Sequence, residues 1–255
     1  MTRPAAEEAA RALVQERFPD AVQAWLAGSV TTGRATATSD LDVTVLLDQG
    51  VVHRESLVHD GWPVELFVHT GASVEHFVAQ DLARRRPTMA RLVALGVPLL
   101  AGDGGAGVRA HCRAVLDRGP GVAGPEAVDL QRYQLTDLLD DLAGATHDEE
   151  ATAIAVDVWR VSAELALTAA GAWLGSGKWL VRELEALDER AGTHLTAALD
   201  LGLRRAITGE RESLAVVADR VLDGVGGRLW AGYRSDANLA GTPERRSHGE
   251  RERRS

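Results

Sequence analysis

The chain has almost no cysteine, since Cys112 is the only one among its 255 residues. A single cysteine excludes an intramolecular disulfide, and no group of cysteine and histidine residues has the spacing of a structural zinc site. Long apolar runs are also missing, because no stretch approaches the roughly 20 residues that a membrane span needs. The N-terminal segment turns acidic at Glu7 before any apolar run. We therefore expect a cytoplasmic protein with no membrane partner.

Positive charge is in short supply as well. Lysine and arginine number 28 against 37 acidic residues, so the net charge is −9. Nonspecific affinity for nucleic acid comes mainly from basic side chains that neutralise phosphates, so this balance disfavours nucleic acid as a partner. The dense basic run in the body of the chain is Arg84-Arg85-Arg86. We interpret it as a solvated helix end rather than a nucleic-acid patch.

Helix-breaking residues divide the chain. Glycine and proline concentrate over 119–125, and nearly everything beyond, up to Tyr233, has helical periodicity. No repeat of fixed period occurs, which argues against a solenoid. We predict an α+β protein with three parts: a part with strands and helices over 1–118, an all-α bundle over 126–234, and a charged, disordered tail over 235–255.

The first part has alternating strand and helix patterns. Apolar residues at helical spacing predict a helix from Pro4 to Phe18. A short apolar strand from Val22 then ends at Gly28-Ser29, and a second strand begins near Asp40. The remaining pattern predicts a hairpin followed by three helices, at 51–59 with 62–69, and at 74–85, 88–95 and 108–117.

Two carboxylates open the second strand. In a strand, alternate side chains point to opposite faces, so Asp40, Asp42 and Thr44 share one face while Leu41 and Val43 face the other. Two carboxylates on one face can bind the same hard cation or bridge two cations, and Mg²⁺ prefers such oxygen ligands. Two ions about 4 Å apart can hold a nucleoside triphosphate in line for displacement.

Such chemistry also needs phosphate donors and a third carboxylate. Gly28-Ser29 follows directly after a strand, where the absent Cβ lets a phosphate approach the backbone and where the hydroxyl and amides can donate hydrogen bonds. Glu65 is an acid inside the apolar run 64–67 and can reach the same end of the sheet. The alternative for Glu65 is an exposed acid that blunts an edge strand.

These residues, in this order, resemble the DNA polymerase β-like nucleotidyltransferase superfamily. The likeness rests on Gly28-Ser29, Ser39-Asp40-Leu41-Asp42 and Glu65, and it covers about 27–68. Within that superfamily the chain is most similar to the aminoglycoside and lincosamide nucleotidyltransferases, because an all-helical part of similar size follows. The resemblance implies that the first part is a small mixed sheet with flanking helices. It also implies magnesium, as two ions, ATP as donor, and transfer of AMP to a hydroxyl with release of pyrophosphate.

The resemblance also implies roles for individual residues. Gly28 and Ser29 would hold the triphosphate, and Asp40 and Asp42 would bind the metals. Glu65 would be either the third metal ligand or the general base that accepts the proton of the acceptor hydroxyl, and the sequence leaves both roles open. Arg34, in the loop after Gly28-Ser29, is a candidate phosphate contact. A lone arginine beside a glycine is more often solvated.

Lys178 is a second candidate phosphate contact. The stretch 175–179 reads Gly-Ser-Gly-Lys-Trp, but the upstream glycine, the Ser or Thr after the lysine and the preceding strand of a Walker-type loop are absent. It is similar instead to a Gly-Lys-Trp junction of the antibiotic transferases, where a lysine reaches back to the nucleotide phosphates. A lysine at a helix start is unfavourable toward the helix dipole, so an anionic partner is plausible.

Asp137 and Glu164 are candidate contacts for the acceptor. Asp137 shares a helix face with Tyr133 and further acids, and Glu164 is an acid in the largely apolar stretch 161–170. A cationic acceptor, such as an aminoglycoside-like antibiotic, would favour carboxylates beside the cleft. Solvation is the default explanation for both residues.

Two other functions remain open from the sequence. The first is modification of a macromolecular partner, as in a protein adenylyltransferase or an antitoxin-like enzyme. The second is a noncatalytic nucleotide-binding protein, because a fold does not fix an activity. The resembling enzymes are commonly dimers, so a homodimer is one option, and the sequence itself leaves the oligomeric state, the donor base and the retention of activity open.

Overall fold

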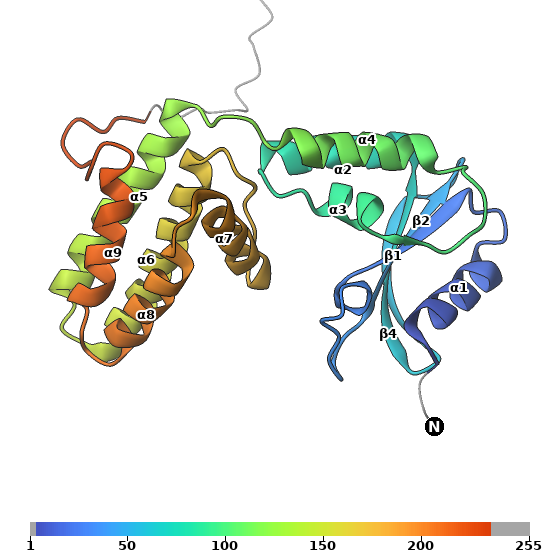
Figure 1. Ribbon diagram of the computed structural model, residues 1–255, viewed down its shortest axis with the longest axis horizontal. Coiled ribbons are helices and arrows are strands. Elements are labelled where there is room, and N and C mark those ends of the chain that lie inside the picture. Colours follow the sequence, from blue (N-terminus) through green and yellow to red (C-terminus); the bar gives the residue numbers. More distant parts are fainter. Residues whose placement is uncertain (1–3, 236–255) are drawn as a thin grey trace, which may run out of the picture.

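The computed structural model describes residues 4–235. These residues form two lobes that lie side by side: a sheet with flanking helices, built from the first half of the chain, and a bundle of helices from the second half (Figure 1). This arrangement confirms the predicted α+β class. Apart from Ser235, the expected disordered tail 235–255 lies outside the described residues.

The sheet of the first lobe has five strands in the order β3-β4-β2-β1-β5. Neighbours are antiparallel except for β2 and β4, which run parallel and place Asp42 opposite Glu65. The parallel pair brings acids that are far apart in sequence to one end of the sheet. The strands are β1 (Gln23–Ala27), β2 (Leu41–Leu47), β3 (His53–His59), β4 (Trp62–Thr70) and β5 (Val97–Pro98).

Helices cover both faces of this sheet. Helix α1 packs on one face, where Leu13 joins a core with Leu41 and Val43. The opposite face is covered by α2, α3 and α4, and its core includes Trp25 and Val93. The helical elements of the lobe are α1 (Ala6–Arg17), the short 3₁₀ helix η1 (Ser29–Thr31), α2 (Gly71–Ala83), α3 (Thr88–Ala94) and α4 (Ala106–Arg118).

The second lobe is an all-helical bundle with its own apolar core. Leucines and small residues from every helix of the bundle meet there, among them Leu135, Ala155, Leu184, Leu199 and Leu214, all fully buried. Its helices are α5 (Pro125–Gly144), α6 (Asp148–Ala169), α7 (Lys178–Ala191), α8 (Leu195–Ile207) and α9 (Glu212–Asp223). Among residues 4–235, no helix is both long and apolar enough to cross a bilayer.

The basic run 84–86 follows the end of α2, and its interpretation as a solvated helix end fits Arg84 and Arg86, which are exposed, but not Arg85, which is half-buried. Arg85 and Arg86 also connect the lobes. The Arg85 guanidinium donates to the carbonyl of Gly121 at 2.9 Å, in the segment between α4 and α5. Arg86 pairs with Glu164 of α6 at 3.2 Å. These partners lie 36 and 78 positions away in sequence. Local charge patterning therefore could not reveal them.

Candidate active site

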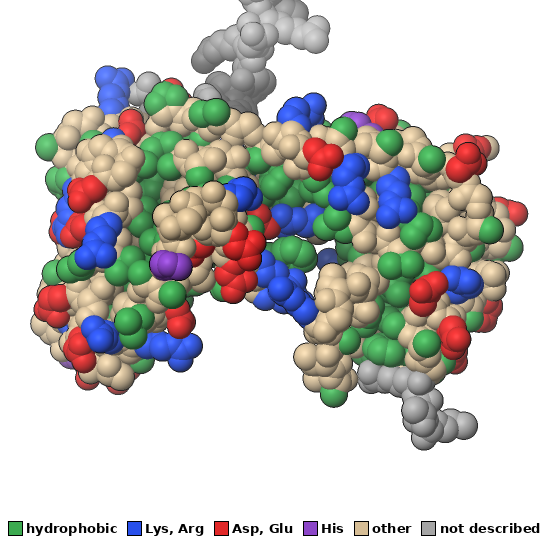
Figure 2. Space-filling view, in the orientation of Figure 1, with side chains coloured by type: hydrophobic (Ala, Val, Ile, Leu, Met, Phe, Trp, Pro, Cys, Tyr) green, Lys and Arg blue, Asp and Glu red, His purple; other side chains and the backbone are tan. Residues whose placement is uncertain are grey.

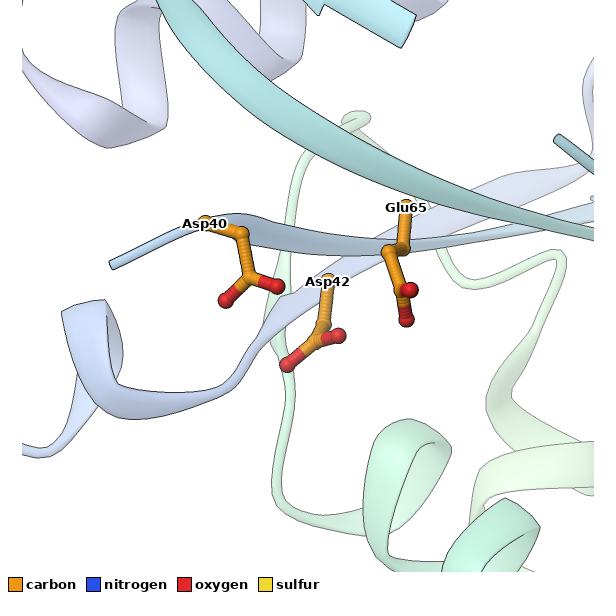
Figure 3. Close-up of side chains that lie close together, drawn as sticks. All are labelled: Asp40, Asp42 and Glu65. Carbon is orange, nitrogen blue, oxygen red and sulfur yellow. The ribbon is translucent and has the colours of Figure 1, made fainter. Parts of the chain in front are cut away.

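Three carboxylates meet at one end of the sheet. Asp40 directly precedes β2, Asp42 is its second residue, and Glu65 is the β4 residue paired with Asp42. Each offers an oxygen atom such that the three oxygens lie within 4.8 Å of one another. Figure 3 shows all three side chains pointing to the same side of the strands. The structure thus brings together the three acids that the sequence predicts.

Strand alternation explains this orientation. Leu41 and Val43 are fully buried against α1, so the residues between and before them point to the opposite face. Asp40, Asp42 and Glu65 are only half-buried, so their carboxylates reach the solvent at the end of the sheet. A cluster with this partial exposure can exchange a cation with solvent while its backbone is held by the sheet ladder.

Gly28 forms the floor of the site. Its φ is +89°, a left-handed value that side chains rarely adopt, and a Cβ atom there would lie 2.4 Å from Asp42 Oδ2. Both the backbone angle and the space therefore require glycine at this position. The absent side chain leaves a cradle against the Asp42 carboxylate, at the turn where the sequence predicts phosphate binding.

Ser29 is held by a second serine. Its hydroxyl hydrogen-bonds the Ser39 hydroxyl at 2.8 Å, and Ser39 Oγ accepts the Thr36 amide at 2.8 Å. Ser39 is buried and precedes Asp40. It closes the loop 29–39 so that the turn and the carboxylates share one end of the sheet. The motif includes Ser39, yet its bracing role needs the loop geometry and is not readable from sequence.

Burial and neighbouring charge shift the titration of Asp42. Burial, followed by the negative charges of Asp40 and Glu65, raises the pKa of Asp42 from 3.8 to about 6, although Lys178 and Arg54 act in the opposite direction. Concentrating three acids is unfavourable without a compensating cation. The cluster therefore has the electrostatics of a cation site, and Lys178 is close enough to influence it.

Arg54 is a site residue that the sequence reasoning missed. It donates to Glu65 at 2.6 Å, and its guanidinium lies 5.2 Å from the centre of the Phe67 ring. In the β3–β4 register, Arg54 faces Phe67 and Ser56 faces Glu65, so Arg54 is diagonal to Glu65. The predicted hairpin contains this signal, because its register about the turn at Asp60-Gly61 places the arginine beside the acid.

A cleft of about 370 Å³ extends from the carboxylates into the space between the lobes. Gly28, Ser29, Asp42 and Glu65 line one side of it, and Lys178 lines it from the helical lobe. Figure 2 shows Lys and Arg side chains inside the hollow between the lobes. The volume lies in the range of small-ligand sites. The basic residues of the lining are Arg54, Arg86, Arg91, Lys178 and Arg182.

The Trp179 ring lies close to two of these cations. The guanidinium of Arg91, from α3, lies 4.6 Å from the centre of the Trp179 ring, and that of Arg182 lies 4.8 Å from it. Arg91 also pairs with Glu183 of α7, whose pKa burial raises even though Arg91 acts to lower it. Helix α7 is thereby joined to α3, and the Lys178 end of the helix is held at the cleft.

Three of the predicted site residues belong neither to the carboxylate cluster nor to the cleft lining. Arg34 is exposed and is absent from the residues that line it. Asp137 is half-buried on α5 and is likewise absent from the lining. The Glu164 carboxylate is held by Arg86 at 3.2 Å and by Arg160 at 3.1 Å. An acid already paired with two guanidinium groups offers little to a cationic acceptor.

A comparison with protein families matches this part of the chain. Residues 8–76 match the family model described as a nucleotidyltransferase domain. That stretch is similar to a nucleotidyltransferase domain. It runs from α1 into α2 and contains Gly28, Ser29, Asp40, Asp42 and Glu65. No curated protein sequence matches the chain.

Among solved structures, the chain resembles a nucleotidyltransferase-like protein from Exiguobacterium sibiricum 255-15. The two share 12% sequence identity at a TM-score of 0.38, over 86% of this chain and 80% of that one. The family-model match and the carboxylate cluster support nucleotidyl transfer in general. The nucleotidyltransferase-domain match ends before the helical lobe begins.

Proposed function

We propose that the protein is a metal-dependent nucleotidyltransferase that transfers a nucleoside monophosphate to a hydroxyl of a small polar acceptor and releases pyrophosphate. The carrying observation is the cluster of Asp40, Asp42 and Glu65 beside the Gly28 cradle. Asp42 and Glu65 of this cluster line a cleft that Lys178 lines from the helical lobe. The family-model match over the same residues supports the reaction class.

The residues present fit magnesium. Asp40, Asp42 and Glu65 provide only oxygen ligands, which Mg²⁺ prefers, and burial, followed by the negative charges of Asp40 and Glu65, raises the pKa of Asp42. These three side chains would hold the metal, as two ions with triphosphate bound. When bound, the metal supplies positive charge that neutralises the phosphates and the departing pyrophosphate.

The chain itself binds and orients the triphosphate. At Gly28 the backbone is open to a phosphate oxygen because no side chain intervenes, and Ser29 begins a 3₁₀ helix that has no side-chain cap at Gly28. Lys178 adds a positive charge from across the cleft, close to Asp42. An anion between these groups relieves the unfavourable placement of a lysine at a helix start.

For Glu65, the ion pair with Arg54 supports the role of metal ligand over that of general base. Arg54 donates to Glu65 Oε1 at 2.6 Å, and the Glu65 carboxylate also contributes an oxygen to the group formed with Asp40 and Asp42. A carboxylate fixed by an arginine beside two other acids is arranged to bind a hard cation. Arg54 is then the residue that holds the Glu65 carboxylate in place at the edge of the cluster.

ATP is the donor that we propose, following the group of transferases that the sequence resembles, and a cytoplasmic location follows from that donor. The acceptor is a small hydroxyl compound, which the cleft volume supports. An aminoglycoside-like antibiotic belongs to this class, and its modification would confer resistance. The basic lining of the cleft does not favour a polycation, so neutral polyols belong in the same acceptor panel.

The test is pyrophosphate release from each nucleoside triphosphate with magnesium and a pooled panel of aminoglycosides, lincosamides and neutral polyols. Wild type is expected to release pyrophosphate only when an acceptor is present, and Asp42→Asn to release none. Asp48→Asn, an exposed acid just after β2, is the matched control and should behave as wild type. Triphosphate binding without release across the panel would replace the proposal with a macromolecular acceptor or a noncatalytic role.

A further inference from the structure

The loop between α6 and α7 belongs to the helical half by sequence but packs on the first lobe. Trp173 is buried in the core formed by Trp25, Val93 and other residues of that lobe. The Trp173 indole donates to the carbonyl of Leu116 at 3.4 Å. The segment that leads to Lys178 is therefore anchored on the lobe that carries the carboxylates.

Arg85 fastens this loop through both its backbone and its side chain. Its carbonyl accepts the Leu174 amide at 2.7 Å, and its guanidinium donates to the carbonyl of Ala172 at 3.4 Å and to that of Gly121 at 2.9 Å. The backbone of Arg85 has a φ of +55°, which is uncommon for a residue with a side chain. One residue thus joins the α2–α3 turn, the segment between the lobes and the α6–α7 loop.

The path from Leu174 to Lys178 is short and closely packed. A Cβ on Gly175 would lie 2.3 Å from the carbonyl carbon of Trp179, so the loop is pressed against the start of α7. The Ser176 carbonyl accepts the Trp179 amide at 3.0 Å, and Gly177 has a φ of +51°. Because the loop is this closely packed, a displacement of Leu174 would also displace Lys178.

We propose that Arg85 is a positioning residue that sets Lys178 against the carboxylate cluster and so controls triphosphate binding. This inference rests on the proposed function, because it assumes that the cleft binds a triphosphate at Lys178. Arg85 does not line the cleft, and it acts through the loop that it holds. Its effect on triphosphate binding therefore depends on the presence of Lys178.

The test is a double-mutant cycle on the full chain, with magnesium tripolyphosphate as probe and calorimetric titration as readout. The probe has no base, so the result is independent of the donor nucleotide. Lys178→Ala is expected to weaken binding about tenfold, as the loss of one charged phosphate contact. Arg85→Ala should weaken it severalfold in the wild-type background and not further in the Lys178→Ala background.

Arg109→Ala is the matched control. Arg109 also donates to two backbone carbonyls, those of Ala94 and Gly96, but within the first lobe and away from the loop. It should leave tripolyphosphate binding unchanged. Arg85→Lys, which retains a donor for one carbonyl, should fall between wild type and Arg85→Ala, and it serves as the test if the alanine variant fails to fold by circular dichroism.

The outcomes separate the two hypotheses. If wild type binds and Arg85→Ala binds equally well, or weakens binding by the same factor with and without Lys178, the positioning role is overturned. An equal loss in Arg109→Ala overturns it too, because general loosening would then explain the effect. If wild type itself fails to bind magnesium tripolyphosphate, the proposed function falls, and the role of Arg85 falls with it.

Discussion

Gly28 gives the sharpest test at the scale of a single residue. In Gly28→Ala, the new Cβ would collide with the Asp42 carboxylate and the left-handed backbone would be strained. We expect the free energy of unfolding to fall by about 1–3 kcal/mol and magnesium-dependent triphosphate binding to be lost. Urea unfolding and calorimetric titration measure the two effects.

Gly33→Ala is the control for backbone strain. Gly33 also has a left-handed φ, +68°, but a Cβ there would have no atom within 4 Å. This variant should lose some stability and keep triphosphate binding. Equal losses of binding in both variants would show that loop strain, rather than the contact with Asp42, explains the effect of Gly28→Ala.

Asp42 yields a prediction on pH and metal. Its pKa of about 6 in the folded chain exceeds the ordinary 3.8, so ionisation favours unfolding, and stability falls as the pH rises from about 4 to 6. Without metal at pH 7, Asp42→Asn should therefore raise the free energy of unfolding, by up to about 3 kcal/mol. Thermal unfolding with EDTA measures this gain.

Magnesium should reverse the order of stability of wild type and Asp42→Asn. Added Mg²⁺ should stabilise wild type, because it binds the folded state and compensates the three acids, and should have little effect on Asp42→Asn. If Asp42→Asn is less stable than wild type in EDTA, the ionised Asp42 side chain makes favourable contacts in the folded chain. The cluster would then not be a site with excess negative charge.

At this scale, the sequence predicted the carboxylates but not their partners. Strand alternation is a local rule, so it placed Asp40 and Asp42 on one face correctly. Arg54 and the bond between Ser29 and Ser39 depend on register and on loop closure, which are set by the folded chain. The side of the cleft formed by Arg91 and Arg182 requires the packing of α3 against α7, which no local pattern describes.

At the scale of elements, Asp188 connects two helices. No side chain caps α8 at its own N-cap residue, His194. Asp188, from α7, instead accepts the amides of Leu195 and Thr196 and the hydroxyls of Thr193 and Thr196, at 2.6–2.8 Å. Burial acts to raise its pKa, but these hydrogen bonds outweigh it and lower the pKa to about 2.

Asp188→Asn should therefore destabilise the bundle at neutral pH. Because the folded pKa lies below the ordinary 3.8, the ionised carboxylate contributes stability above about pH 4, and this contribution is lost as the pH falls toward 2. We expect a loss of about 1–2 kcal/mol at pH 7, allowing for partial exposure. Urea unfolding at several pH values should show that difference shrinking between pH 4 and 2.

Asp200→Asn is the control for that experiment. Asp200 pairs with Arg204 on the exposed surface of α8, where an ion pair contributes little. The free energy of unfolding lost in Asp200→Asn should stay within about 0.5 kcal/mol at every pH. A pH-independent loss in Asp188→Asn would show that shape, and not the charge of the carboxylate, caps α8.

Most elements were predictable because their signals are local. The Asp60-Gly61 turn has positive φ at both residues, as a two-residue turn of type I′ requires, and the predicted hairpin matches β3 and β4 within a few residues. The prediction omitted β5, because two residues that include Pro98 have no strand pattern. The parallel pairing of β2 with β4 is nonlocal, and the sequence did not predict it; the resemblance to a known family implied only a mixed sheet.

At the scale of the whole molecule, the net charge of the chain is opposite in sign to the basic residues that line the cleft. The chain carries a formal charge of −9, yet five basic residues line the space between the lobes. Basic residues from α3 and α7 meet there only after the lobes pack together. The net charge describes the electrostatic field far from the protein, which disfavours contact with nucleic acid. The anion binding that we propose depends instead on the basic residues that line the cleft.

Coupling between the lobes gives the last prediction. Trp173 lies in the helical half by sequence, is 8% exposed, and fills the core of the first lobe. Trp173→Ala should cost about 3–4 kcal/mol, because it leaves a large cavity. The cost falls on the first lobe, and the packing of the α6–α7 loop on that lobe is lost with it. Calorimetric unfolding should therefore change from one transition to two.

Trp230→Ala is the matched control for this change. Trp230 is 57% exposed and stacks on Tyr133 within the helical lobe, 5.3 Å between ring centres. Its removal should lower the midpoint slightly and preserve a single transition. If Trp173→Ala also unfolds in one transition, the lobes are coupled by the ion pairs of Arg86 and Arg91 instead. Combining Trp173→Ala with Arg91→Ala should then separate the two transitions, because the pairing of α3 with α7 is removed as well.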